Sequence, residues 1–268
     1  MAGALLLACW LPGIAQDVVL AGGTGSGSRL LQALADEYAK KAAGGPVIRV
    51  ADPPLGSGAA IKAVRDGKLH LAVSGRPLEG DERGAELAEF ELARTPFVFA
   101  SRDGVHHGGF SLGQLEDLYG GRRGTWDGGG PVRLVLRPKF DADNLILRAM
   151  SAGMDKALTQ ALERKGMVVA SSDMEALEII EQTPGSLGST TLGLIRLQGS
   201  TVQVFPVAGR IPSVKALSDG TYPWFKPLYL VTRKPAPAGV QAFLDFLTSP
   251  QAAEFMARTE HLPAFHGR

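Results

Sequence analysis

The chain has 268 residues, of which 45% are hydrophobic and 21% are charged. This balance is that of a globular protein, which excludes long disordered segments and leaves room for one large domain or two lobes. The formal net charge is +1, from 28 Lys and Arg against 27 Asp and Glu, so we expect neither a nucleic acid nor an anionic membrane as a partner.

Residues 1–16 are predicted to be an export signal. Their apolar stretch, "ALLLACWLPGIA", is too short to cross a bilayer as a helix. Gly13 and Ala15 lie three and one residues before Gln16, where we expect cleavage. The single cysteine, Cys9, would be removed with the signal, so the mature chain forms no disulfide. A buried N-terminal strand and lipid attachment at Cys9 are the less favoured alternatives.

Strand and helix patterns then alternate along the mature chain. A strand at 18–21 leads into a helix from about Arg29, for which Ser26 or Ser28 would be the N-cap. The next predicted elements are a strand at 47–51, a helix around 60–64 and a strand at 68–74. This β-α-β-α-β order predicts a mostly parallel sheet that is covered by helices.

The rest of the chain continues the alternation. Two capping boxes, Ser111 with Gln114 and Ser172 with Glu175, predict the starts of two helices. The remaining predicted elements are strands at 95–102, 131–137, 185–193, 202–207 and 222–232, and helices at 112–120, 145–150, 174–182, 239–249 and 250–258.

Small polar loops follow several of these strands, and most of them precede a helix. Ligands in α/β sheets bind at the carboxyl ends of strands, so these loops predict one shared site of hydroxyls, backbone N–H groups and an arginine. Each loop taken alone also fits an ordinary helix cap. The candidate residues are Thr24, Gly25, Ser26, Gly56, Ser57, Gly58, Ser74, Gly75, Arg76, Arg137, Asp141, Asp143 and Asn144.

Nucleotide binding and catalysis are disfavoured. The loop "GGTGSGS" lacks both the G-x-G-x-x-G spacing and the lysine of a P-loop. The histidines show neither metal-ligand spacing nor an accompanying G-x-S-x-G motif. They are His70, His106, His107, His261 and His266, for which we expect structural or surface roles. We therefore expect no cofactor, no metal and no enzymatic activity, with a nucleotide-using enzyme as the alternative.

Four stretches resemble, in order and spacing, the periplasmic phosphate-binding proteins of ABC importers over nearly the whole mature chain. They are "LAGGTGSGSRLLQALADEYAKK", "GSGAAIKAVRDGKLHLAVSGRPL", "FSLGQLEDLYGGRRGTWDGG" and "YPWFKPLYLVTRK". The Gly-Ser-Gly loop at 56–58 and the Ser-x-x-Pro-Leu pattern at 74–78 are fairly specific to that family.

The resemblance implies an α/β protein with the type II periplasmic-binding fold, in which two lobes with mostly parallel sheets are joined by hinge strands. The first lobe would contain 17–98 and 206–268, and the second lobe 99–205. The protein would be periplasmic and monomeric, and would capture a small oxyanion, with phosphate expected, for an ABC permease of the inner membrane. A ligand sensor or scaffold with the same fold is the alternative.

The family's oxyanion contacts match particular residues of this chain. The resemblance implies that Thr24, Gly25 and Ser26 supply hydroxyls and N–H groups, that Ser57 supplies a second-loop hydroxyl, and that Arg137 supplies the positive charge. These positions agree with the set that the loops predict.

The chain departs from the family pattern at two places. Gly75 replaces the aspartate that accepts a proton of hydrogen phosphate, and Asp141-Ala142-Asp143 replaces Ser-Gly-Thr. If Asp141 and Asp143 face the cleft, they can accept that proton and exclude sulfate. If they only cap their helix, the site should tolerate sulfate-like dianions. We expect the first case, with phosphate or a hydroxylated organic phosphate as the ligand.

Overall fold

The computed structural model describes residues 17–265, apart from 43, 85 and 104–107. Outside the described residues lie the predicted signal, Cys9, His106, His107 and His266. The strands are β1 (Val18–Gly23), β2 (Val47–Val50), β3 (Leu71–Ser74), β4 (Leu87–Ser101), β5 (Arg133–Leu136), β6 (Val168–Val169), β7 (Ser186–Thr191), β8 (Gln203–Phe205), β9 (Phe225–Arg233) and β10 (Leu262–Pro263).

These strands form one continuous sheet in the order β2-β1-β3-β9-β4-β7-β5-β6, and β8 and β10 pair with β4. The helices are α1 (Gly25–Lys41), α2 (Ser57–Arg65), α3 (Leu112–Gly120), α4 (Ala142–Met150), α5 (Ala152–Glu163), α6 (Asp173–Gln182), α7 (Leu192–Gln198), α8 (Val214–Ser218), α9 (Ala238–Leu247) and α10 (Pro250–Arg258), with a short 3₁₀ helix η1 (Gly80–Arg83).

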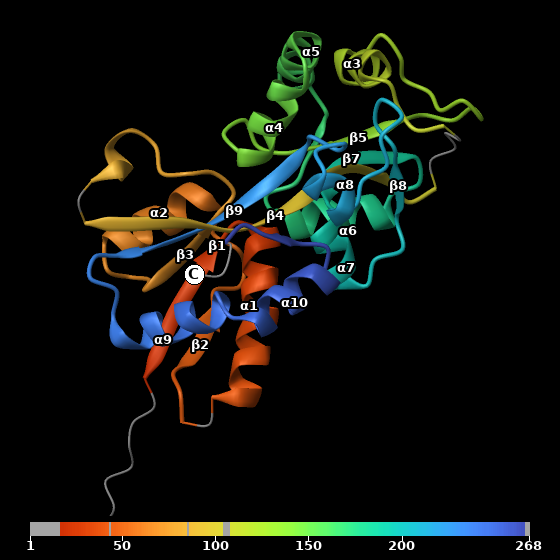
Figure 1. Cartoon of the computed structure of the whole chain (residues 1–268). Helices are drawn as coiled ribbons and strands as arrows, with labels where there is room; N and C mark the ends of the chain where they lie inside the picture. The colour runs from red at the N-terminus through yellow and green to blue at the C-terminus, as the bar shows by residue number, and fades with distance from the viewer. Residues whose placement is uncertain (1–16, 43, 85, 104–107, 266–268) are drawn as a thin grey trace, which may run out of the picture.

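The first lobe is built around β2, β1 and β3, which pair in parallel as the sequence predicts. Helices α1, α9 and α10 pack on one face of these strands, where Leu31 and Phe243 are fully buried (Figure 1). Helix α2 covers the other face through Ile61. Each fully buried side chain of this size contributes roughly 1.5–3 kcal/mol to stability, so both helical layers fix the ends of the strands in place.

The second lobe is built around the second half of β4, which pairs in the antiparallel direction with β7 and β8. β5 pairs in parallel with both β7 and β6. Helices α3, α4 and α5 pack on one face against Phe97 and Leu136, and α6 and α7 pack on the other face against Val98 and Val135 (Figure 1).

Strands β4 and β9 run between the two lobes and pair with each other along most of their length. β9 also pairs with β3, so the predicted strand at 222–232 returns to the first lobe. Val207 and Trp224 nevertheless pack against the core of the second lobe. The division of the chain at residues 98 and 205 stays a prediction.

Several local predictions are wrong in detail. Helix α1 begins at Gly25 instead of Arg29, Thr24 is its N-cap, and Ser26 and Ser28 lie inside its first turn. Ser172 does cap α6, but the Glu175 carboxylate accepts from the Ser171 N–H at 2.6 Å, so no capping box forms there. Helices α5, α7 and α8 were not predicted. The capping box of Ser111 with Gln114 is confirmed.

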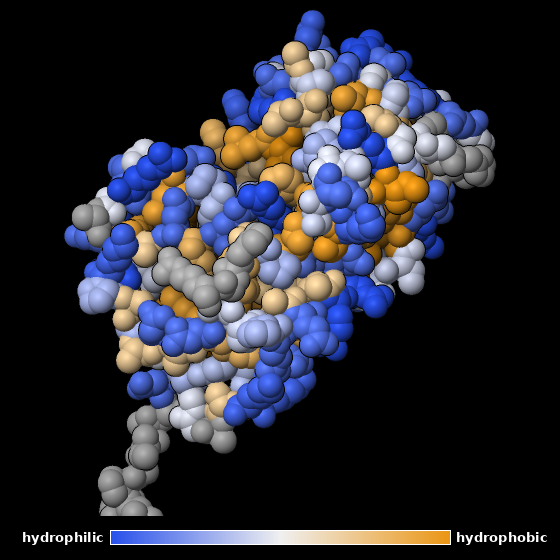
Figure 2. All heavy atoms as spheres, in the orientation of Figure 1, coloured by the Kyte–Doolittle hydropathy of each residue, from blue (hydrophilic) through white to orange (hydrophobic). Residues whose placement is uncertain are grey.

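No helix among the described residues is both long and apolar enough to cross a membrane. Figure 2 shows hydrophilic side chains over most of the visible face, with hydrophobic side chains in separate patches.

Candidate functional site

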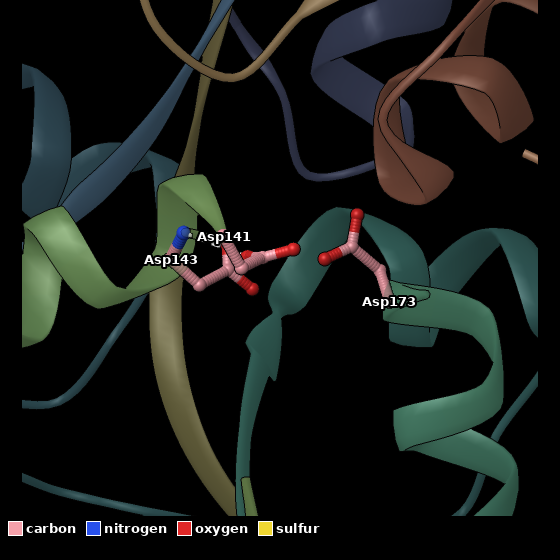
Figure 3. Close-up of side chains that lie close together, drawn as sticks. All are labelled: Asp141, Asp143 and Asp173. Carbon is pink, nitrogen blue, oxygen red and sulfur yellow. Dashed lines mark hydrogen bonds between the residues drawn. The ribbon is translucent and has the colours of Figure 1, made fainter. Parts of the chain in front are cut away.

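The first turn of α1 faces the second lobe where the loops after β5 and before α6 meet it. Arg137 follows β5 directly, and Asp141 is the N-cap of α4, where its Oδ1 accepts from the Asp143 N–H at 2.9 Å. Figure 3 shows Asp141 and Asp143 at the start of α4 and Asp173 at the start of α6, with the three carboxylates gathered together. Parallel strands thus bring loops from distant parts of the chain to one place.

Arg137 is buried, with 3% of its surface exposed, and it holds this group of carboxylates together. Its Nη2 donates to Asp141 Oδ2 at 2.6 Å, and its Nη1 donates to the Ala170 carbonyl at 2.7 Å. Its Nη2 also lies 3.7 Å from Asp173 Oδ1, and its Nε lies 3.9 Å from Asp143 Oδ2. The guanidinium therefore faces all three carboxylates.

A second buried cation, Lys226, enters from the crossing strand β9. Its Nζ lies 2.6 Å from Asp143 Oδ1 and donates to Asp173 at 2.9 and 3.0 Å. Burial by itself would lower the pKa of Lys226, but Asp143 and Asp173 raise it above its ordinary value. Lys226 is therefore charged at all physiological pH values.

Asp173 connects the second lobe to the N-terminus of α1. Its Oδ2 accepts from the Thr24 hydroxyl at 2.9 Å and from the Ser26 N–H at 2.7 Å. We call the Thr24 hydroxyl, the Ser26 N–H, Lys226 Nζ and Arg137 Nη2 the anion cradle. A helix N-terminus favours negative charge, and the two cations add to this preference.

The environment separates the pKa values of two of the carboxylates. Burial would raise the pKa of Asp173, but Lys226 and Arg137 together with the Ser26 N–H hold it well below its ordinary value. Burial raises the pKa of Asp143 to about 7, and Asp173 adds to this effect although Lys226 opposes it. Asp173 is therefore the permanent anion of the cluster, whereas Asp143 titrates near neutral pH.

The raised pKa of Asp143 predicts that stability falls as the pH rises. The unfolded chain releases this proton near 3.8 and the folded protein near 7. Between these values the folded state holds the extra proton, so Asp143 contributes a fall in the free energy of unfolding of up to about 1.4 kcal/mol per pH unit as the pH rises. His261, whose pKa burial lowers to about 4, contributes a rise over much of the same window, so the contribution of Asp143 is read from the difference between the slopes of two proteins. Urea unfolding across this window measures each slope. The slope of Asp143→Asn should be more positive than that of the parent, and the slope of the exposed-site control Asp36→Asn should equal that of the parent; equal slopes in all three proteins would contradict the prediction.

The structure brings together Thr24, Gly25, Ser26, Arg137, Asp141 and Asp143, which were predicted from the sequence. Ser57 lies beside them, because its hydroxyl accepts from the Gly75 N–H at 2.9 Å. Gly75 itself faces Lys226: a Cβ atom at Gly75 would lie 2.9 Å from Lys226 Cε. A side chain at this position would therefore require the end of the Lys226 side chain to shift.

Arg76, Ser74 and Gly58 lie outside the carboxylate cluster, and their predicted part in ligand binding stays a prediction. The Arg76 guanidinium donates to both carboxylate oxygens of Glu82, at 2.7 and 2.9 Å. The Ser74 hydroxyl donates to the Arg76 carbonyl at 2.6 Å and so closes a local turn. Gly58 lies next to Arg76, whose Nη2 is 3.8 Å from the position of a Cβ atom at Gly58. These groups are satisfied within the first lobe.

The three carboxylates of Asp141, Asp143 and Asp173 lie within 4.8 Å of one another, as in a metal site. Each of them already pairs with Arg137 or Lys226, so we propose no metal there. His70 and His261 lie elsewhere: His70 Nδ1 accepts from the Leu20 N–H at 3.0 Å, and burial lowers the pKa of His261 to about 4.

Comparison with known proteins identifies related chains. The model of the PBP superfamily domain matches residues 12–251. The phosphate-binding protein PstS of Staphylococcus saprophyticus is 22% identical over 217 residues, which cover 75% of this chain and 66% of that protein. This chain therefore spans about two thirds of the length of that curated relative.

Solved structures share the fold. A phosphate ABC transporter substrate-binding protein of Clostridium perfringens with bound phosphate has a TM-score of 0.79 and 18% identity, over 93% of this chain and 100% of that chain. An ABC-type phosphate transport receptor of Vibrio cholerae has a TM-score of 0.67 and 16% identity, over 91% and 99% of the two chains. The predicted two-lobed α/β fold is confirmed.

Proposed function

The chain belongs to the PBP superfamily, and from this premise we propose that it is a solute-binding protein for a small oxyanion of the phosphate class. The relatives named above are a phosphate-binding protein, a substrate-binding protein of a phosphate ABC transporter and an ABC-type phosphate transport receptor. We propose accordingly that this chain is a receptor without catalytic activity.

The anion cradle is the observation that carries this proposal. A hydroxyl, a backbone N–H at a helix start and two buried cations already coordinate one carboxylate, which is the chemistry that an oxyanion needs. Two more donors near it, the Ser26 hydroxyl and the Arg137 Nε–H, are buried without a hydrogen-bond partner among the described residues. Buried donors of this kind favour a ligand that can accept their hydrogen bonds.

Titration calorimetry of the full mature chain with phosphate and with sulfate tests the proposal. We expect phosphate to bind, and Arg137→Gln to weaken the binding at least about tenfold, because a charged, fork-shaped donor near the ligand is lost. Arg133→Gln is the matched control, because Arg133 stands at the exposed start of the same strand. Equal affinities in the two variants, or no phosphate binding by the parent, would contradict the proposal.

The selectivity for a protonated ligand also remains our proposal. Asp141 both caps α4 and binds Arg137, and Asp143 is buried against Lys226. Both carboxylates therefore lie within the cluster, and each of them contacts a buried cation in addition to any part in capping α4. A carboxylate in this place repels a dianion that carries no proton, so sulfate should bind more weakly than phosphate in the same calorimetric series.

We further propose that the chain is exported by its N-terminal signal, acts in the periplasm as a monomer and delivers its ligand to an ABC permease of the inner membrane. The support comes from the relatives of Clostridium perfringens and Vibrio cholerae, which are the substrate-binding protein of a phosphate ABC transporter and an ABC-type phosphate transport receptor. N-terminal sequencing of the protein from the cell envelope tests the export, and an intact Met1 would contradict it.

A sensor or scaffold of the same fold is the second candidate function. The observation that favours it is the Asp173 carboxylate, which holds the anion cradle from the opposite lobe. A protein whose lobes are joined in this way can keep a fixed shape without transporting anything. Absence of binding for phosphate, sulfate and phosphonates, together with an unchanged shape in their presence, would favour this candidate.

A further inference from the structure

Asp173 binds in the anion cradle as an oxyanion ligand would. Its Oδ2 accepts from the Thr24 hydroxyl and the Ser26 N–H, and Lys226 Nζ contacts both of its oxygens. The donors belong to the first lobe and to the crossing strand β9, whereas Asp173 begins α6 in the second lobe. The second lobe thus supplies the carboxylate, and the first lobe and β9 supply its hydrogen-bond donors, while Arg137 of the second lobe lies 3.7 Å away.

The Asp173 carboxylate packs directly on the first turn of α1. A Cβ atom at Gly25 would lie 3.1 Å from both the Cβ and the backbone N of Asp173, and 3.3 Å from its Oδ2. The first turn of α1 therefore touches Asp173 directly. An oxyanion that takes the Thr24 hydroxyl and the Ser26 N–H has to displace the carboxylate first.

A cavity of about 100 Å³ lies next to this contact and is lined from both lobes. Ser28 and Arg29 of α1 line one side, and Met174, which follows Asp173, lines the other. The Arg29 Nε–H is buried there without a hydrogen-bond partner among the described residues. The cavity thus offers a positively charged donor, Arg29, close to the start of α6, although the Asp52 carboxylate lines it as well.

We propose that Asp173 determines the affinity and the charge class of the ligand, because its carboxylate is an intramolecular competitor for the anion cradle. This inference rests on the proposed function. Exchanging the carboxylate for a singly charged oxyanion leaves the charge beside Arg137 and Lys226 unchanged. A dianion adds one negative charge in buried surroundings, where charge imbalance is costly. The favoured ligands are therefore dihydrogen phosphate and singly charged organic phosphates or phosphonates, and sulfate is disfavoured.

The test compares the full mature chain with Asp173→Asn and Asp173→Ser. Both variants remove the Asp173 charge that raises the pKa of Asp143, so Asp143 ionises more readily beside Lys226, 2.6 Å away, and we expect both variants to fold. Glu175→Gln is the matched control, because it removes one carboxylate from the first turn of the same helix without touching the anion cradle. Calorimetry measures the binding of sodium phosphate and sodium sulfate, and small-angle X-ray scattering measures the radius of gyration with and without phosphate.

We expect both Asp173 variants to bind phosphate at least about tenfold more tightly than the parent and the control, and to gain still more affinity for sulfate. Without phosphate, both variants should have a larger radius of gyration than the parent, and phosphate should reduce it. Equal or weaker phosphate affinity in the variants overturns the inference while the proposed function stands. If no protein in the series binds phosphate, the proposed function is wrong. The radius of gyration then still tests the inference, because equal radii in the parent and in the two Asp173 variants would overturn it.

Discussion

Lys226→Met is expected to lower the free energy of unfolding by about 3–5 kcal/mol, because it leaves two buried carboxylates without their closest cation. Lys226 is fully buried and lies 2.6 Å from Asp143 and 2.9 Å from Asp173. Arg137 is the remaining cation near these carboxylates among the described residues, at 3.9 and 3.7 Å. Methionine fills a similar volume, so the loss measures the charge and not a cavity. Urea unfolding monitored by circular dichroism gives the value.

Two further variants separate charge from other effects. Lys215→Met is the matched control, because Lys215 is 89% exposed and pairs with Asp219 at the surface, so we expect a change within about 0.5 kcal/mol. Adding Asp143→Asn to Lys226→Met should recover part of the lost stability, since one of the uncompensated charges is then gone. A loss in Lys226→Met no greater than that in the control would show that the buried cluster does not depend on this lysine.

Gly23→Ala is expected to lower the free energy of unfolding by about 3 kcal/mol and to weaken oxyanion binding as well. Gly23 is paired with Val73 in the parallel ladder of β1 and β3. A Cβ atom at Gly23 would lie 1.8 Å from the Val73 carbonyl oxygen and 2.7 Å from its carbonyl carbon. Backbone atoms cannot turn aside as a side chain does, so the two strands have to separate.

That separation would also move the N-terminus of α1. The Thr24 N–H donates to the same Val73 carbonyl at 3.0 Å, and Thr24 supplies the hydroxyl of the anion cradle. Gly22→Ala is the matched control, because a Cβ atom there would meet no backbone atom among its nearest neighbours and its shortest contact, with Ala51 Cβ at 3.2 Å, needs only a small shift. Chemical unfolding and phosphate calorimetry on both variants measure the two effects. Similar results for Gly22→Ala and Gly23→Ala would contradict this account.

The alternation of strands and helices could be predicted because it rests on local hydrophobic periodicity. The convergence of Thr24, Ser26 and Arg137 could be predicted as well, since the carboxyl ends of parallel strands meet at one edge of a sheet. The start of α1 could not be predicted, because Gly25 and Gly27 have low helix propensity and favour a loop. Contacts with the rest of the fold outweigh that preference.

Asp173 and Lys226 were missed for a different reason. Asp173 follows a helix N-cap, where an acidic residue has a sufficient local explanation in the helix dipole. Lys226 lies in the apolar strand "FKPLYLV", and its partners are 53 and more residues away in the chain. A lysine within an otherwise apolar central strand was the available signal, because such a residue is seldom buried without a partner. Which carboxylate would pair with it depends on how the two lobes meet, and no local pattern contains that information.

The tethering of Asp173 to the protein has a consequence for the concentration range in which the receptor responds. An intramolecular group competes at an effective concentration that is commonly in the millimolar range, however dilute the protein is. If the two lobes are joined through Asp173 for about 99% of the time, the apparent dissociation constant for the free anion is about a hundredfold larger than the intrinsic one. Such a receptor would stay unoccupied while its ligand is scarce and would fill when the ligand is abundant. Its role would then be uptake or detection under replete conditions, where a receptor of high affinity is already saturated and no longer reports any change in supply.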